Sequence, residues 1–103
     1  MKRLVLTPRA KQDLNDIWDF IADDDIGAAD RVLDALETTM VKLAKNPGIG
    51  HWREELTDKR HRFYLVYSYL IIYRQGTKPL QIVRVLHAAR NVQSILGLAA
   101  DDL

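Results

Sequence analysis

The sequence predicts a small α+β domain in which a helical hairpin covers one face of a mainly antiparallel sheet. Two observations favour this class. Residues 8–45 place apolar side chains at helical spacing, and residues 62–87 hold β-branched and aromatic runs separated by short turns. Together with a short apolar strand at residues 3–7, they predict the order β-α-α-β-β-β in a single domain spanning residues 1–103.

Both predicted helices carry start signals. Thr7 can cap the free N–H groups of the first helix, and Pro8 suits its first turn. Asp25 can cap the second helix, and the segment NPGIG at residues 46–50 ends it. The short link between the helices predicts an antiparallel hairpin. The apolar positions expected in the core are Ala10, Leu14, Ile17, Trp18 and Ile21 in the first helix and Val32, Leu33, Leu36, Met40 and Leu43 in the second.

Strand-like composition begins after a polar segment at residues 51–61. The predicted strands are residues 62–67, 69–74 and 80–87. Ser68 leaves room only for a tight turn between the first two, and QGTKP at residues 75–79 is a plausible hairpin loop. Residues 91–98 are predicted to form a short C-terminal helix.

The last strand carries the polar residues of greatest interest. If its side chains alternate regularly, Val83 and Val85 face the helices, while Arg84 lies on an open face with Ile82 and Leu86 exposed beside it. A surface of this mixed apolar and basic character suits an amphipathic partner segment. Aromatic and arginine side chains anchor interfaces well, so the predicted partner contacts are Tyr64, Tyr73, Arg84 and Leu86.

Charge is distributed unevenly along the chain. Residues 1–50 hold seven Lys/Arg against nine Asp/Glu, whereas residues 51–90 hold eight against three. A basic second half can meet an acidic protein or nucleic acid, although a net charge of +1 is low for a domain that binds nucleic acid by itself. The candidates for contacting a target are Arg53, Arg60, Arg62 and Arg90.

Several classes of function are disfavoured. The chain contains no cysteine and its first 20 residues are charged, which predicts a cytoplasmic protein without disulfides or thiolate metal sites. No apolar run is long enough to span a membrane. The three histidines lack metal-ligand spacing and the glycines form no phosphate-binding loop, so we expect neither a metal nor a cofactor.

Four stretches together resemble a known family: LTPRAKQDLNDIWDFIA (6–22), LAKNPGIG (43–50), YSYLIIYR (67–74) and IVRVLHAARN (82–91). They resemble the ParE branch of the RelE/ParE superfamily, the toxins of bacterial type II toxin–antitoxin and plasmid-stabilisation modules. The resemblance covers nearly the whole chain in the right order. It implies the fold predicted above, a ParD-like or other small antitoxin that neutralises the toxin, and DNA gyrase as the target.

RelE-like relatives instead cut mRNA on the ribosome, and this remains the alternative. Cleavage through the RNA 2′-hydroxyl needs a base, a cation and an acid, for which the chain offers Glu54 or Glu55, Arg62 or Arg84, and His87. However, Leu70 stands where RelE-like nucleases often carry arginine, and Ala88 follows His87 where a histidine-ending site continues with tyrosine. His87 can equally be a hydrogen-bonded structural residue at the strand's end.

We therefore predict a toxin that acts by binding and has no catalytic residues of its own. A third hypothesis is a degenerate family member that has lost toxicity and only binds its antitoxin. The sequence does not separate this member from an active toxin, because toxicity can depend on a few surface residues.

Overall fold

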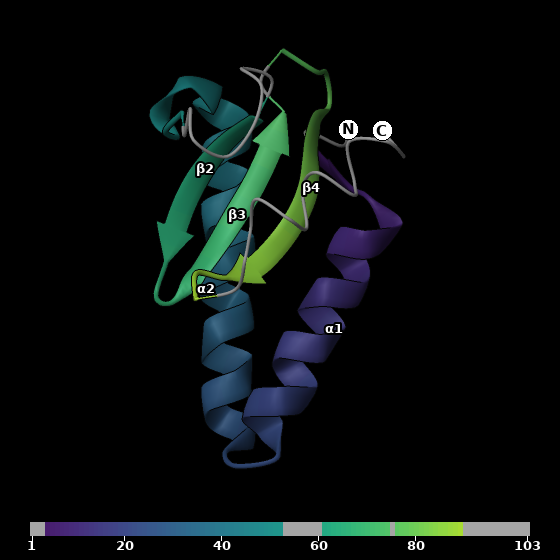
Figure 1. The fold of residues 1–103 in the computed structure, drawn as a ribbon, viewed down its shortest axis with the longest axis vertical. Helices are drawn as coiled ribbons and strands as arrows, with labels where there is room; N and C mark the ends of the chain where they lie inside the picture. Colours follow the sequence, from purple (N-terminus) through teal and green to yellow (C-terminus); the bar gives the residue numbers. More distant parts are fainter. Residues whose placement is uncertain (1–3, 53–60, 75, 90–103) are drawn as a thin grey trace.

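A computed structural model describes residues 4–52, 61–74 and 76–89 of the chain. Two antiparallel helices lie against one face of a four-stranded sheet, as Figure 1 shows. The strand order is β1-β4-β3-β2, in which β1 pairs with β4 in parallel and the other neighbours are antiparallel. The predicted α+β class and the order β-α-α-β-β-β are therefore confirmed. The elements are β1 (Leu4–Leu6), α1 (Pro8–Ala22), α2 (Ile26–Lys45), the 3₁₀ turn η1 (Pro47–Ile49), β2 (His61–Val66), β3 (Tyr69–Arg74) and β4 (Leu80–His87).

Thr7 fixes the start of α1 and ties it to the sheet. Its Oγ1 accepts a hydrogen bond from the N–H of Ala10 at 3.1 Å, as an N-cap does, and donates to the carbonyl of Val83 at 2.7 Å. Its backbone N–H donates to the carbonyl of Ile82 at 3.0 Å. The predicted cap of α2 is also present, because Asp25 accepts from the N–H of Ala28 at 3.0 Å.

The residues between helices and sheet form the main core. The helices contribute the buried residues Ala10, Ile17, Leu36, Met40 and Leu43, and the sheet contributes Ile71, Tyr73, Leu80, Ile82 and Val85. A second buried cluster contains only sheet residues, which are Phe63, Leu70, Ile72, Val83 and Leu86. Because side chains alternate along strands, this cluster lies on the face opposite the helices. The prediction of an open, partly exposed second face is therefore wrong.

A β-bulge in β4 explains why the predicted orientations fail. Ile72 pairs with Arg84, but the next residue of β3 pairs with Ile82, which leaves Val83 as an extra residue. Ile82 and Val85 consequently face the helices, and Val83 and Leu86 face the other way. Regular alternation assigned Val85 correctly but exchanged Ile82 and Val83.

The β2–β3 turn has the tight geometry that the spacing predicted. It consists of Tyr67 and Ser68, and Tyr67 has a φ of 53°, as two-residue hairpin turns commonly require. The predicted C-terminal helix at residues 91–98 lies outside the described residues. Within the part of the chain that the structure describes, no helix is long and apolar enough to cross a membrane.

Candidate functional site

A buried ion pair joins α1 to the outer edge of β4. Arg84 donates two hydrogen bonds to the Asp13 carboxylate, from Nε to Oδ2 at 2.8 Å and from its terminal nitrogen to Oδ1 at 2.9 Å. The backbone N–H of Val85 also donates to Asp13 Oδ2, at 3.0 Å. The exposed side-chain fractions are only 11% for Arg84 and 9% for Asp13. The hydrogen bonds to Asp13 raise the pKa of Arg84 above its ordinary value, against an opposing effect of burial, and keep the guanidinium charged.

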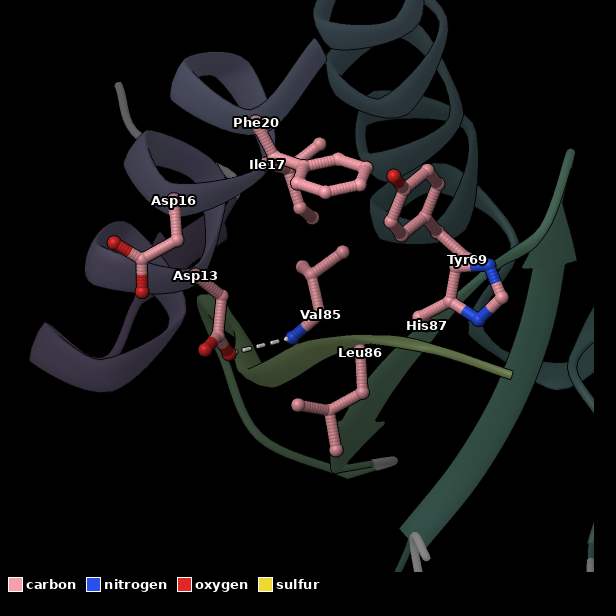
Figure 2. A pocket seen from close by; sticks show the side chains of 8 residues that line it. All are labelled: Asp13, Asp16, Ile17, Phe20, Tyr69, Val85, Leu86 and His87. Atoms are coloured by element: carbon pink, nitrogen blue, oxygen red, sulfur yellow. Dashed lines mark hydrogen bonds between the residues drawn. The ribbon is translucent and has the colours of Figure 1, made fainter. Parts of the chain in front are cut away.

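A cleft of about 320 Å³ opens beside this ion pair, between α1 and the end of β4. Figure 2 shows Ile17 and Phe20 on the helix side, Tyr69 and His87 on the sheet side, and Val85 between them. The remaining lining residues are Asp13, Asp16 and Leu86. Asp13 thus contributes to the cleft as well as holding the edge of β4. The walls are mainly apolar and aromatic, as in binding sites, and two carboxylates lie along one side.

Among the residues that line the cleft, His87 is the one whose side chain most often acts in acid–base catalysis. It lies at the end of β4, where its ring contacts Tyr69 edge-on with ring centroids 5.4 Å apart. Its Nδ1 accepts a hydrogen bond from the N–H of Ala89 at 3.0 Å. His87 therefore makes a hydrogen bond at the strand's end, and its assignment as a structural residue stays a prediction.

A second cluster of polar contacts lies around η1 and the far end of β3. The Tyr73 hydroxyl donates to the carbonyl of Pro47 at 2.7 Å and accepts from the N–H of Gly50 at 2.9 Å. Arg62 donates to the carbonyl of Gly50 at 2.7 Å and stacks over the ring of Trp52, 4.0 Å from its centroid. Burial raises the pKa of Tyr73, while the Gly50 hydrogen bond and the charge of Arg62 act in the opposite direction. These contacts fix the chain segment that follows α2.

Two of the four predicted partner contacts lack the exposure that made them candidates. Tyr73 is fully buried in the main core, and Leu86 is buried in the second cluster with 1% of its surface exposed. The Arg84 side chain is largely buried and held by Asp13, so it does not lie on an open face. Tyr64 is half-buried, and it packs against the main core with the Lys42 ammonium 5.9 Å from its ring centroid. Their contacts with a partner stay a prediction.

Among the described residues, the candidates for RNA cleavage are not gathered in one place. Arg62 pairs with Tyr73 and His87 pairs with Tyr69, on opposite sides of β3. Arg62 and His87 are therefore four residues apart along the strand direction, which is about 13 Å, and two strands apart across the sheet, which is about 10 Å. Arg84 is bound by Asp13. Glu54 and Glu55 lie outside the described residues, as do the target candidates Arg53, Arg60 and Arg90.

Sequence reasoning missed two important residues of the site. Asp13 was not among the residues predicted for the core or for the site, yet it lies three residues after Ala10 and four before Ile17, both in the core. A residue at those spacings borders the apolar stripe, and this signal could have identified it. Phe20 did not belong to the predicted stripe, and its side chain is 76% exposed at the cleft. Within the described residues no cluster of His, Asp and Glu could hold a metal ion.

Comparisons with known proteins mainly match ParE toxins. A family model described as the ParE toxin of the type II toxin–antitoxin system parDE matches residues 4–92. The toxin ParE1 of Caulobacter vibrioides is 36% identical over 100 residues, covering 94% of this chain and 100% of the relative. The toxin ParE1 of Mycobacterium tuberculosis is 32% identical over 92 residues, covering 87% of this chain and 93% of the relative. A solved structure of the chromosomal ParDE toxin–antitoxin system from P. aeruginosa has a similar fold, with a TM-score of 0.68 at 20% identity over 82% of this chain and 92% of that chain.

Proposed function

Because the chain belongs to the ParE toxin family of type II toxin–antitoxin systems, we propose that it acts by binding DNA gyrase and is neutralised by a cognate antitoxin. The antitoxin is a ParD-like or other small protein. Gyrase is a cytoplasmic enzyme, so the proposal assigns the toxin to the cytoplasm as well. The toxin inhibits gyrase through its surface, without a covalent step of its own.

The dispersed positions of the candidate catalytic residues carry this proposal. An RNase that uses the 2′-hydroxyl must hold a cation against the phosphate while an acid reaches the leaving oxygen. The Arg84 guanidinium instead makes two hydrogen bonds to Asp13, and the register positions of Arg62 and His87 are far apart. Using Arg84 as the cation would require breaking a buried ion pair, and bringing Arg62 and His87 to one phosphate would require rearranging the sheet. A surface that binds needs no such rearrangement.

The basic second half of the chain supplies the proposed gyrase contacts. Arg62 is the described member of this set, and its position is fixed by Gly50 and by the half-exposed ring of Trp52. Arginine and tryptophan are both enriched among the residues that anchor interfaces. Together with Arg53, Arg60 and Arg90 it forms the proposed target-binding set.

The decisive test is plasmid supercoiling by purified gyrase, with and without the purified toxin at matched salt. Dose-dependent inhibition or trapped cleaved DNA, reversed by the antitoxin, is the expected result. The same preparation is added to translating ribosomes programmed with a defined mRNA, where no cleavage is expected. mRNA cleavage without an effect on gyrase would replace the proposal with the RelE-like alternative. Inactivity in both assays, with antitoxin binding retained, would identify a non-toxic family member.

A further inference from the structure

Phe20 is the most unusual side chain at the cleft between α1 and β4. It is 76% exposed, while its neighbour on the same helical face, Ile17, is buried. The rings of Phe20, on α1, and Tyr69, on β3, both line the cleft (Figure 2). Ile17 and Val85 line the same cleft. A large exposed aromatic side chain beside an apolar cleft is typical of a docking site for another apolar group.

The acidic side chains that line the cleft are Asp13 and Asp16, and the Arg84 guanidinium beside it is bound by Asp13. Residues 12–30 contain seven aspartates and no lysine or arginine. Some of these carboxylates have structural roles: Asp13 holds Arg84, Asp25 caps α2 and Asp30 accepts a hydrogen bond from the indole of Trp18. Asp16 lines the cleft and is exposed. Asp23 and Asp24 follow Phe20 by three and four residues, which continues the same helical face beyond the cleft.

From the apolar walls and the acidic border together, we infer that the cleft binds a basic amphipathic segment of the antitoxin. An aliphatic side chain of this segment enters between Phe20 and Tyr69, and lysine or arginine side chains flanking it reach Asp16 and Asp23. The inference rests on the proposed function, because it assigns the cleft to the antitoxin rather than to gyrase. It also gives the antitoxin site and the gyrase site opposite charges, because the cleft has an acidic border and the proposed gyrase contacts are all arginines.

Other occupants fit the cleft less well. A small anionic ligand would face Asp13 and Asp16, and an acidic peptide would meet the carboxylates that continue along α1. A second copy that docked through the same face would place two acidic borders against each other. Opposite charge across an interface mainly accelerates association and selects the partner, whereas the buried apolar side chain supplies most of the affinity.

Two synthetic helical peptides test the inference. They share one leucine stripe at positions i, i+3, i+4 and i+7 and carry either lysine or glutamate at every polar position. Each peptide is labelled with fluorescein, and its affinity for the full-length toxin is measured by anisotropy at low and high salt. Amide chemical shifts of the ¹⁵N-labelled toxin locate the bound peptide. Four toxin variants complete the design, namely Phe20→Ala, Asp16→Asn, Leu65→Ala and Asp34→Asn.

The lysine peptide is expected to bind at least about tenfold more tightly than the glutamate peptide at low salt, and added salt should reduce this difference. Phe20→Ala should weaken binding of the lysine peptide by about thirtyfold, as loss of an interface anchor does. Asp16→Asn should weaken it by about threefold. The matched controls should leave affinity unchanged, because Leu65 is exposed on β2 and Asp34 is exposed on α2, both outside the cleft. Shift changes should centre on Phe20, Tyr69 and Val85.

Three results would overturn the inference: binding of neither peptide, equal or tighter binding of the glutamate peptide, or full affinity in the folded Phe20→Ala variant. These peptide measurements contain no gyrase, so their outcome is independent of the supercoiling assay. Binding of the lysine peptide at the cleft without gyrase inhibition would retain the site and refute the proposed target. Gyrase inhibition without peptide binding would support the proposed target and refute the cleft as the antitoxin site.

Discussion

The ion pair between Asp13 and Arg84 should contribute strongly to stability. Asp13 accepts three hydrogen bonds, two from Arg84 and one from the N–H of Val85, in a site where both side chains are about nine-tenths buried. Removing one partner of a buried pair typically costs about 3–5 kcal/mol, because the other charge is left without compensation. A cost of this size is a large part of the roughly 5–15 kcal/mol that stabilises a small domain.

Two substitutions keep the chain foldable while breaking the pair. Asp13→Asn retains an oxygen that can accept from Val85 and loses the charge, so we expect a loss of about 2 kcal/mol. Arg84→Met retains most of the apolar volume but leaves a buried carboxylate with one hydrogen bond, so we expect a loss of about 3 kcal/mol. For a domain of this length each kcal/mol lowers Tm by about 4–8 °C.

The measurement is urea denaturation of the wild type, both single variants and the double variant, followed by far-ultraviolet circular dichroism. The double variant should be destabilised by at least about 1 kcal/mol less than the sum of the single losses, because the two side chains interact directly. Asp16→Asn, one helical turn away and exposed, is the control and should change little. Losses that add to within about 0.3 kcal/mol would show no coupling free energy between the two side chains and would refute this reasoning.

Three further predictions follow from the same structure. Tyr73→Phe leaves the buried N–H of Gly50 and the carbonyl of Pro47 without the Tyr73 hydroxyl, so it should lower the free energy of unfolding by about 2–3 kcal/mol at neutral pH. The control Tyr67→Phe, at an exposed position, should change it very little. Burial raises the pKa of Tyr73 above its ordinary value of 10.0, so its contribution to stability is complete below that pH and is lost as pH rises through the folded-state pKa. In denaturation curves at increasing alkaline pH, the stability of the wild type should therefore approach that of Tyr73→Phe. A constant difference in stability between the two would contradict this. Gly50→Ala should destabilise the chain by about 1–3 kcal/mol in thermal unfolding, since the added Cβ would lie 2.8 Å from a ring carbon of Tyr73, while Gly48→Ala has open space and should be neutral. His87→Ala should retain gyrase inhibition at normal stability, because its Nδ1 only accepts from the N–H of Ala89; loss of inhibition with a normal melting curve would revive a catalytic role.

The sequence predicted the fold well because its signals are local. Thr7 and Asp25 cap the helices as expected, and the β2–β3 connection is tight as expected, although it holds Tyr67 as well as Ser68. The orientation of β4 could not be predicted in the same way. The bulge depends on pairing between β3 and β4, and one extra residue changes which side chains face the helices.

The same error affected the predicted site. Because Ile82 and Leu86 were assigned to an exposed face, Arg84 was interpreted as a surface anchor. Its partner, Asp13, lies 71 positions earlier in the chain. A contact between such distant positions depends on how α1 crosses the sheet edge, and no local pattern encodes it. The position of Asp13 at the border of the apolar stripe marks it as half-buried but does not identify what it binds.

The cleft follows from the shortness of β1. This strand pairs with β4 only from Leu80 to Ile82, although β4 continues to His87. An uncovered strand edge invites pairing with another chain, and proteins commonly protect such edges with side chains or helices. Here Thr7 and then Asp13 bind successive backbone groups of β4, at Val83 and Val85, so α1 replaces the missing strand.

The contacts of Thr7 and Asp13 with β4 end at Val85. Beyond this point α1 continues towards the connection between the two helices, which extends past the end of the sheet in Figure 1. Asp16, Ile17 and Phe20 therefore line an opening rather than the edge of β4. A longer β1 would place backbone along the side of β4 where Asp13 now binds and would displace α1 from it. The ion pair and the cleft thus have one structural cause, and weakening Asp13 should alter binding at the cleft as well as stability.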